Sequence, residues 1–345
     1  MVRDRPVRSG SPHLTRTEVK PLSDLDVLVI GAGLAGLTAA RRLVDAGRSV
    51  LVVDKGRGVG GRLATRRIGD GVFDHGAQFF TSAEPEFDTE VATWVDAGVA
   101  AQWFDTRLEP DGSLVTDGHP RWRGTNGMSG IAKHLAASLD VRTGCRLVSL
   151  AVDNGAWTAV DSDDGVIRAE SIVVTAPVPQ TLALFDAGAV GLDANDRRDL
   201  DAVDYHPCIA VLALLDGPSG LPTPGALRPA GEPLDWVADN QMKGISPVPA
   251  LTVHAGTATS RALWDASDDV VVEQLLAAVP GLASGPIAGG VQVQRWLYAR
   301  PVECRPEAAR LLFGLPAAVL AGDAFGGARV PGAAASGNAA AALLL

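Results

Sequence analysis

The chain has 345 residues, 47% of them hydrophobic and 20% charged, a balance that is ordinary for a globular protein large enough to form two compact lobes. Its formal net charge of -10 argues against a nucleic-acid groove as the main functional surface, although a local basic pocket for an anionic substrate stays open. No apolar run is long enough to span a bilayer, so we expect neither nucleic-acid nor membrane partners.

The N-terminal residues and the cysteines indicate in which cellular compartment we expect the protein. Residues 1–24 carry Arg3, Arg5, Arg8 and Arg16 among Pro, Ser and Gly, without the apolar segment of a signal peptide, which predicts a disordered leader. The three cysteines are far apart and lack CxxC spacing, which favours a reducing cytoplasm over a disulfide scaffold. They are Cys145, Cys208 and Cys304.

A glycine-rich turn follows the first apolar segment, residues 27–30, and apolar residues then recur at helical spacing. Gly31 permits the turn, Gly33 lets the backbone approach a pyrophosphate, and Gly36 lets the helix pack close to the strand. The helix N-terminus, which includes Leu34 and Ala35, offers unpaired N–H groups to phosphates. This pattern predicts a strand, a turn and a helix that bind a dinucleotide.

A second apolar strand over residues 49–53 ends at Asp54, which lies 23 residues after Gly31, where a carboxylate would accept hydrogen bonds from an adenosine ribose. NAD and FAD sites share these features. The turn that comes next contains Gly60, Gly61 and Arg62, and glycines here free the backbone to lie along a pyrophosphate. Arg57 or Arg62 can neutralise that pyrophosphate, although a solvated basic loop is the alternative.

With this Gly-Gly-Arg turn the chain resembles the glutathione-reductase-type FAD enzymes, in the branch that holds the flavin amine oxidases and the renalases. The resemblance implies that residues 74–78, Asp-His-Gly-Ala-Gln, lie beside the isoalloxazine. It also implies that Asp323 of the Gly322-Asp323 pair contacts the ribityl or phosphate region of FAD, and that the helix after it points its N-terminus at the flavin pyrimidine carbonyls. Pro331 replaces the acidic residue expected there but suits the first turn of a helix.

The remaining pattern predicts further elements in chain order. They are a helix over 84–96, a hairpin over 103–122 that turns at 109–112, a helix over 126–139, a parallel strand at Val141, a meander over 146–168, a buried strand over 171–175, strands over 209–215 and 250–255, a helix over 268–279, a strand over 318–321 and a final alanine-rich helix over 333–345.

These elements predict an α/β protein with a discontinuous, Rossmann-like FAD-binding lobe and a second substrate lobe of mixed β-sheet plus helices. We assign residues 25–85, 126–180 and 291–345 to the first lobe and residues 86–125 and 181–290 to the second. The predicted cofactor-binding residues are Gly31, Gly33, Leu34, Ala35, Gly36, Asp54, Lys55, Arg57, Gly60, Gly61, Arg62, His75, Gly76, Ala77, Gly322, Asp323, Arg329, Val330 and Ala333. No cysteine follows Gly322-Asp323, so we expect FAD to be held non-covalently.

The run from Asp54 to Arg67, with residues 73–80, 294–301 and 322–327, narrows the resemblance to bacterial renalase-type proteins along nearly the whole chain. That family is implied to oxidise the 1,2- and 1,6-dihydro isomers of NAD to NAD and to pass the electrons through FAD to O2, giving peroxide. A dihydropyridine already donates hydride, so the protein needs to stack it on the flavin and exclude water, with no strong base.

The candidate catalytic residues lie in segments that would face the flavin. They are Gln78, His254, Trp296 and Tyr298, with Trp236, Asn240 and Arg261 as further pocket candidates. Gln78 would bind a carboxamide or the flavin edge, whereas His254 is also explained as a hydrogen-bonded strand histidine. Trp296 and Tyr298 share a strand face and would cover the flavin or belong to the core.

Two alternative functions stay open, an oxidase or dehydrogenase of an amine or other small metabolite and a flavin-binding protein without turnover. A paired-tyrosine amine cage is not expected, because Tyr205 and Tyr298 are the only tyrosines. Lys243 could hold a water, but a solvated loop lysine is the favoured interpretation, and Arg295 meets substrate phosphates or is solvated. We expect small-molecule partners, O2 among them, and a monomer or weak dimer.

Overall fold

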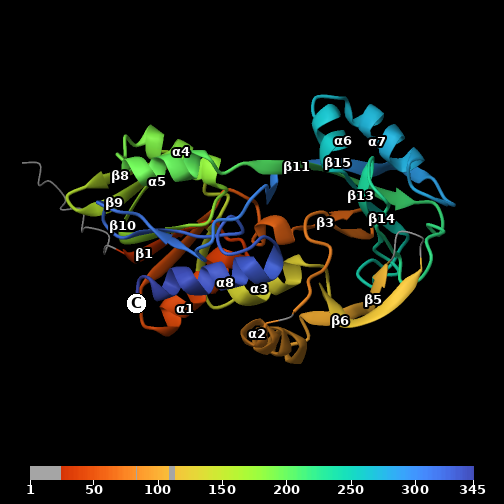
Figure 1. The fold of residues 1–345 in the computed structure, drawn as a ribbon, viewed down its shortest axis with the longest axis horizontal. Coiled ribbons are helices and arrows are strands. Elements are labelled where there is room, and N and C mark those ends of the chain that lie inside the picture. The colour runs from red at the N-terminus through yellow and green to blue at the C-terminus, as the bar shows by residue number, and fades with distance from the viewer. Residues whose placement is uncertain (1–24, 83, 109–112) are drawn as a thin grey trace, which may run out of the picture.

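The computed structural model describes residues 25–82, 84–108 and 113–345. The disordered leader expected over 1–24 and the hairpin turn expected at 109–112 lie outside these residues. Figure 1 shows two lobes, one built on a large sheet with helices on both faces and one built on a smaller sheet, joined by the long strands β11 and β15. The predicted α/β class is confirmed.

The large sheet has a parallel centre in the order β17, β10, β1, β2, β7. On one side β16 pairs antiparallel with β17, and the meander β8 and β9 pairs with the first half of β10. The strands are β1 (Leu25–Ile30), β2 (Val50–Asp54), β7 (Asp140–Thr143), β8 (Leu147–Asp153), β9 (Ala156–Asp161), β10 (Val166–Val174), β16 (Arg310–Leu311) and β17 (Ala318–Leu320).

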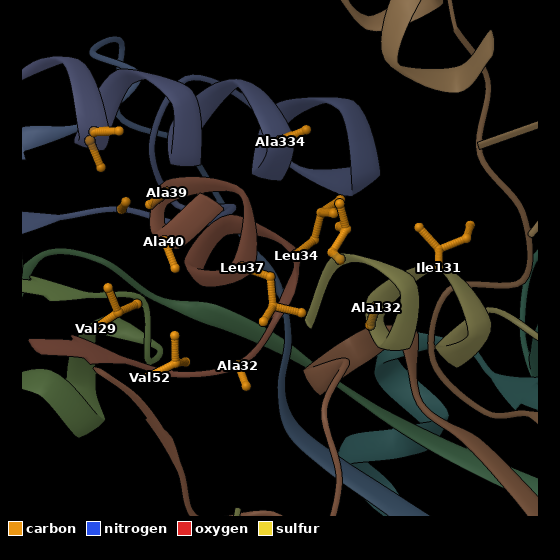
Figure 2. Packing of buried hydrophobic residues seen from close by; sticks show 14 of the residues in the cluster. Val29, Ala32, Leu34, Leu37, Ala39, Ala40, Val52, Ile131, Ala132 and Ala334 are labelled. Carbon is orange, nitrogen blue, oxygen red and sulfur yellow. The ribbon is translucent and has the colours of Figure 1, made fainter. Parts of the chain in front are cut away.

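Alternation along the central strands sends apolar side chains into two separate cores. Val29 and Val52 pack on one face with the helices α1, α3 and α8, whereas Leu28 and Leu51 pack on the other face with the meander and the helices α4 and α5. Figure 2 shows the first core, with Leu34 of α1 beside Ile131 of α3. These helices are α1 (Leu34–Asp45), α3 (Ser129–Ala136), α4 (Val178–Ala187), α5 (Ala194–Asp201) and α8 (Arg329–Ala342).

The second lobe is an antiparallel sheet in the order β12, β13, β14, β11, β15, with two helices packed on one face. Its elements are β11 (Tyr205–Leu215), β12 (Ala226–Leu227), β13 (Leu234–Asp239), β14 (Ala250–Ala255), α6 (Thr257–Ala262), α7 (Asp268–Ala277) and β15 (Pro286–Pro301). Two small ribbons and two helical segments complete the chain. They are η1 (Gly61–Leu63), the pair β3 (Thr65–Ile68) and β4 (Gly71–Asp74), α2 (Pro85–Asp96), and the pair β5 (Ala100–Leu108) and β6 (Leu114–Gly124).

Most predicted elements are present with small shifts at their ends. The helix predicted over 126–139 is shorter, because glycine turns precede α3 and residues 140–143 pair as β7. The helices α4, α5 and α6 were not predicted, since the segment that holds them was interpreted mainly as strands. The division into domains stays a prediction, and the packing of α4 and α5 on the first sheet favours a boundary near residue 204.

The sheet order locates the site. From β1 the chain moves to β2 on one side, and β10 lies on the other side, so the strand order reverses at β1. Ligands of open α/β sheets bind outside the carboxyl ends of the strands at such a switch point. The turn that follows β1, the end of β2 and the N-terminus of α1 all lie at this edge.

Candidate active site

The turn between β1 and α1 uses its three glycines differently. Gly31 has a positive φ of 110°, and a Cβ on Gly36 would overlap the Gly31 carbonyl oxygen. Gly33 is extended, with φ -77° and ψ 179°, and a Cβ there would meet none of the described atoms within 4 Å. Backbone conformation and packing therefore require Gly31 and Gly36, whereas Gly33 leaves open space beside the turn, as expected where a pyrophosphate approaches.

Asp54 and two helix N-termini supply polar groups around this space. The Asp54 carboxylate accepts hydrogen bonds from the N–H groups of Ala32, at 2.7 Å, and Gly56, at 2.6 Å. Among the described residues, no side chain caps the N-terminus of α1 or of α8, and neither first turn contains an acidic residue. Both helix ends therefore present positive dipole ends without an internal anion, which fits a bound dinucleotide.

Arg62, one of the predicted phosphate ligands, binds other residues of the protein instead. Its Nη1 and Nη2 donate to the two carboxylate oxygens of Asp323, both at 2.6 Å. Nη1 also donates to the carbonyls of Tyr298 and Ala299. Arg62 thus ties the glycine turn, β15 and the Gly322-Asp323 segment together, and Asp323 balances its charge.

Two other predicted cofactor cations lie at the surface. Lys55 donates to the Gln180 side chain at 2.9 Å. Arg57 is exposed and makes no side-chain hydrogen bond or ion pair within the described part of the chain. Arg57 is therefore the cation of this turn that stays available to a phosphate.

The predicted loop 74–78 packs against the same turn. Ala77 N–H donates to the Arg62 carbonyl at 2.8 Å, and a Cβ on Gly76 would overlap that carbonyl, so the two backbones touch. The Gln78 amide nitrogen donates to the carbonyls of Asp74, at 2.6 Å, and Gly76, at 3.2 Å. The Gln78 side chain thereby stabilises the loop of residues 74–78. Its carbonyl oxygen takes no part in these bonds.

The structure brings Gln78 close to His254 and places Trp296 on His75, in the same loop as Gln78. The Gln78 amide nitrogen lies 3.5 Å from His254 Nε2. Trp296 stacks on His75, with ring centroids 5.3 Å apart and planes 17° apart, and its indole N–H donates to the His75 carbonyl at 2.8 Å. Burial lowers the pKa of both His75 and His254 to about 4, so both imidazoles are neutral near pH 7.

Lys243 is buried, although the sequence favoured a solvent-exposed loop lysine. It lies in the turn after β13, and its ammonium donates to Asp74 at 2.6 Å, with both side chains fully buried. Asp74 also accepts from the Thr65 hydroxyl and from the Met128 N–H. The interpretation of Lys243 as a solvated loop lysine is therefore wrong, because a partner 169 residues earlier in the chain holds it inside.

Unfilled hydrogen-bonding atoms gather around this junction. Within the described residues, the buried polar atoms without a hydrogen-bond partner include His75 Nδ1, Gln78 Oε1, Trp236 Nε1 and Asn240 Oδ1. Trp236 and His254 are paired across β13 and β14, and Asn240 follows β13. All four atoms are buried and belong to groups that carry no charge in their neutral forms, so the polar groups left without partners at the junction are uncharged.

Aromatic side chains extend this surface. Phe79 lies 5.1 Å from Trp236 and 6.5 Å from Trp103 between ring centroids, and Phe104 lies 4.9 Å from Trp103. The Lys243 ammonium lies 5.1 Å from the Trp103 ring. The contribution of Trp103 and Phe104 was not predicted, since they belong to a hairpin that shows only alternation in the sequence.

Of the other pocket candidates, Tyr298, Arg261 and Arg295 lie away from this junction, whereas Asn240 lies at it with its amide nitrogen already bonded. Tyr298 packs edge to face on Tyr205, with centroids 5.4 Å apart, and both line a cavity of about 390 Å³ with Arg261. Asn240 is fully buried and donates to Thr252 and to the carbonyl of Ala250. Arg295 donates to Asp268 at 2.6 Å, so neither of the two predicted states, phosphate contact or full solvation, describes it.

Two known protein families match parts of this chain. Residues 29–96 match the model of the NAD(P)-binding Rossmann-like domain, and residues 106–345 match that of the flavin containing amine oxidoreductases. A protein of Mycobacterium tuberculosis named as a flavin-containing monoamine oxidase is 37% identical over 113 residues, and a putrescine oxidase of Kocuria rosea is 43% identical over 61 residues. These matches cover 33% and 18% of this chain, and only 22% and 13% of the relatives.

Solved structures share the fold over a much longer span. A structure of putrescine oxidase bound to putrescine has a TM-score of 0.69 at 15% identity and covers 92% of this chain and 98% of its own. A structure named as a protoporphyrinogen oxidase from Exiguobacterium has the same TM-score at 13% identity and covers 94% and 98%. In the described residues, no helix is long and apolar enough to cross a membrane.

Proposed function

The chain belongs to the flavin containing amine oxidoreductase family, and on that premise we propose that it is an FAD-dependent oxidoreductase that takes hydride from an uncharged group of a small metabolite. The leading candidate for the donor is an isomeric dihydronicotinamide nucleotide, oxidised to NAD(P) with O2 as the electron acceptor. In this proposal the FAD lobe is the one built on the large sheet, with α4 and α5, and the substrate lies between it and the second lobe.

The residues at the switch point fit a non-covalent FAD. The open space beside Gly33 and the uncapped N-terminus of α1 would receive the pyrophosphate, and Asp54 and Arg57 would bind the ribose and a phosphate. The uncapped N-terminus of α8 would lie against the flavin carbonyls. When bound, FAD supplies the hydride acceptor and then the reduction of O2 to H2O2.

The uncharged hydrogen-bonding atoms at the junction of the two lobes support the dihydronicotinamide nucleotide as the hydride donor. Gln78 Oε1 and Asn240 Oδ1 are acceptors without partners, and His75 Nδ1 and Trp236 Nε1 are unfilled ring nitrogens. A nicotinamide carboxamide offers both N–H donors and a carbonyl acceptor, so it matches such a set.

The protonation of the site supports the same donor. The neutral imidazoles of His75 and His254 do not repel an uncharged ring, and hydride transfer from a dihydropyridine needs no base. In this proposal Gln78 and His254 orient the donor, and the packed Trp296 excludes water from it.

A small amine is the second candidate, favoured by the aromatic group of Phe79, Trp103 and Trp236. Aromatic faces hold alkylamines by apolar contact and by attraction to their positive charge. The buried carboxylate of Asp74 is already paired with Lys243, so it is not available to a cationic amine.

The two donors are separated by mixing the flavin-loaded protein, without oxygen, with isomeric dihydro-NAD, ordinary NADH and a panel of amines. We expect the dihydro-NAD isomers to bleach the visible flavin absorbance fastest. The variant Gln78→Leu should bind FAD but slow the bleaching by about tenfold or more, since it removes the unfilled acceptor. Rapid bleaching by amines alone would overturn the leading candidate, and no bleaching by any donor would favour flavin binding without turnover.

A further inference from the structure

A second cavity lies outside the residues assigned to FAD or to its donor. Its volume is about 510 Å³, and it opens between the ribbon strand β3, the start of the β5 hairpin and helix α3. It is lined by Arg67, Val99, Asn126, Gly130, Lys133 and His134.

The lining of this cavity is basic in an acidic protein. Its lining holds a guanidinium, an ammonium and an imidazole, from Arg67, Lys133 and His134, whereas the chain as a whole carries a net charge of -10. The cavity lining contains no carboxylate. Within the residues that the structure describes, none of these three side chains makes a hydrogen bond or an ion pair.

Arg67 and Lys133 are exposed, so solvent screens their repulsion, and an anion between them would add an attraction to both charges. Two partly buried cations elsewhere are paired with carboxylates, Arg62 with Asp323 and Arg295 with Asp268, whereas the cations of this cavity have no such partner. Gly130 adds an opening on the helix side, since a Cβ there would meet none of the described atoms within 4 Å.

We propose that this cavity binds a phosphate group of a small metabolite. The guanidinium of Arg67 would bind two phosphate oxygens, Lys133 would act as a point charge, and Asn126 and His134 would add hydrogen bonds. The site is separate from the FAD pyrophosphate site at the β1 turn.

The cavity also adjoins the lobe junction through β3. The Thr65 hydroxyl donates to Asp74 and accepts from the N–H of Ser129, the first residue of α3. Arg67 follows Thr65 on the same face of this strand, since side chains alternate along it. A phosphate bound between Arg67 and Lys133 therefore links β3 to α3, close to the Thr65 hydroxyl that donates to Asp74.

The test is calorimetric titration of the flavin-loaded protein with inorganic phosphate and with pyrophosphate at constant ionic strength, so that bound FAD fills its own site. We expect saturable binding to the wild-type protein. Arg67→Gln and Lys133→Gln should each weaken it by about tenfold, and the double variant should abolish it. Arg228→Gln, which removes an exposed cation in the second lobe, should bind like the wild-type protein.

A second measurement does not depend on variants of the two cations. Imidazole NMR signals should include one that shifts on addition of phosphate and disappears in His134→Gln. No saturable binding to the wild-type protein, or an equal loss in Arg228→Gln, would overturn the proposal, and so would unchanged binding in the double variant. Because no donor is present, the result does not depend on the proposed oxidation.

Discussion

At the scale of single residues, the pairing of Lys243 with Asp74 shows how the two lobes are joined. Both charges are fully buried and lie 2.6 Å apart. Burial lowers the pKa of Lys243, and the Asp74 carboxylate opposes that change. Because each buried charge is costly without the other, the pair holds the turn after β13 against the end of β4.

We expect Lys243→Met to lower the free energy of unfolding by about 3 to 5 kcal/mol, since it leaves the buried Asp74 carboxylate without the ammonium that it contacts. Urea denaturation measures this loss. The control Lys55→Met removes an exposed lysine and should change stability by less than about 0.5 kcal/mol. Adding Asp74→Asn to Lys243→Met should recover part of the loss, and equal stabilities for the Lys243 and Lys55 variants would contradict the assigned role.

The buried imidazoles predict how stability depends on pH. Burial lowers the pKa of His75 and His254 from 6.5 to about 4, so between these values the unfolded chain binds more protons than the folded protein. Stability should be fully present above about pH 6.5 and fall as the pH drops towards 4, by at most about 1.4 kcal/mol per pH unit for each imidazole.

Urea denaturation of the wild-type protein across this pH range measures the effect. His254→Gln should reduce the slope, and His134→Gln, which keeps both buried imidazoles, should leave it unchanged. A slope that His254→Gln does not alter would show that other groups set the pH dependence.

At the scale of elements, two glycines of the turn after β1 have different roles, one in cofactor binding and one in packing. Gly33→Ala should cost the cofactor-free protein at most about 1 kcal/mol, the penalty of alanine at a helix N-cap, because its Cβ meets open space. It should weaken FAD binding by about tenfold or more, since the methyl group occupies the approach of the pyrophosphate.

Gly36→Ala should instead destabilise the cofactor-free protein by about 1 to 3 kcal/mol, because its Cβ overlaps the Gly31 carbonyl. FAD titration followed by flavin fluorescence, together with urea denaturation, separates the two effects. Wild-type FAD affinity in Gly33→Ala would contradict the assignment of this space to the cofactor.

Elements that depend on local pattern were predictable from the sequence. The turn with Gly31, the strand that ends at Asp54 and the helix over 85–96 have their signals within a few residues, and the structure has them where expected. The helix α5, with sequence ANDRRDLD, has so few apolar residues that periodicity does not reveal it, and it is held by Leu200 in the core beneath it.

The site was predictable only in part, for a related reason. The candidates Gln78 and His254 lie close together in the structure, and the candidate Trp296 packs on the neighbouring His75. Lys243 was misjudged and Trp103 was missed, because the burial of each depends on contacts with residues more than a hundred positions away. No local pattern records such contacts.

At the scale of the whole molecule, several links join the two lobes. The strands β11 and β15 extend from one lobe into the other, as Figure 1 shows. Arg66 of β3 donates to the side chains of Gln292 and Gln294 on β15, at 3.0 and 3.1 Å, and Arg62 and Lys243 add the links described above. The proposed donor site lies among these links, so the geometry of the site depends on the lobes staying together.

We therefore expect the two lobes to unfold as one unit. Heating the flavin-loaded protein should give coincident midpoints for secondary structure, tryptophan fluorescence and flavin release. Arg66→Gln should lower all three midpoints together, because it removes links worth about 0.5 to 1.5 kcal/mol each. Arg197→Gln, which breaks only exposed ion pairs within one lobe, should have a smaller effect. Midpoints that do not coincide would mean that the lobes open independently and that these links do not fix the donor site.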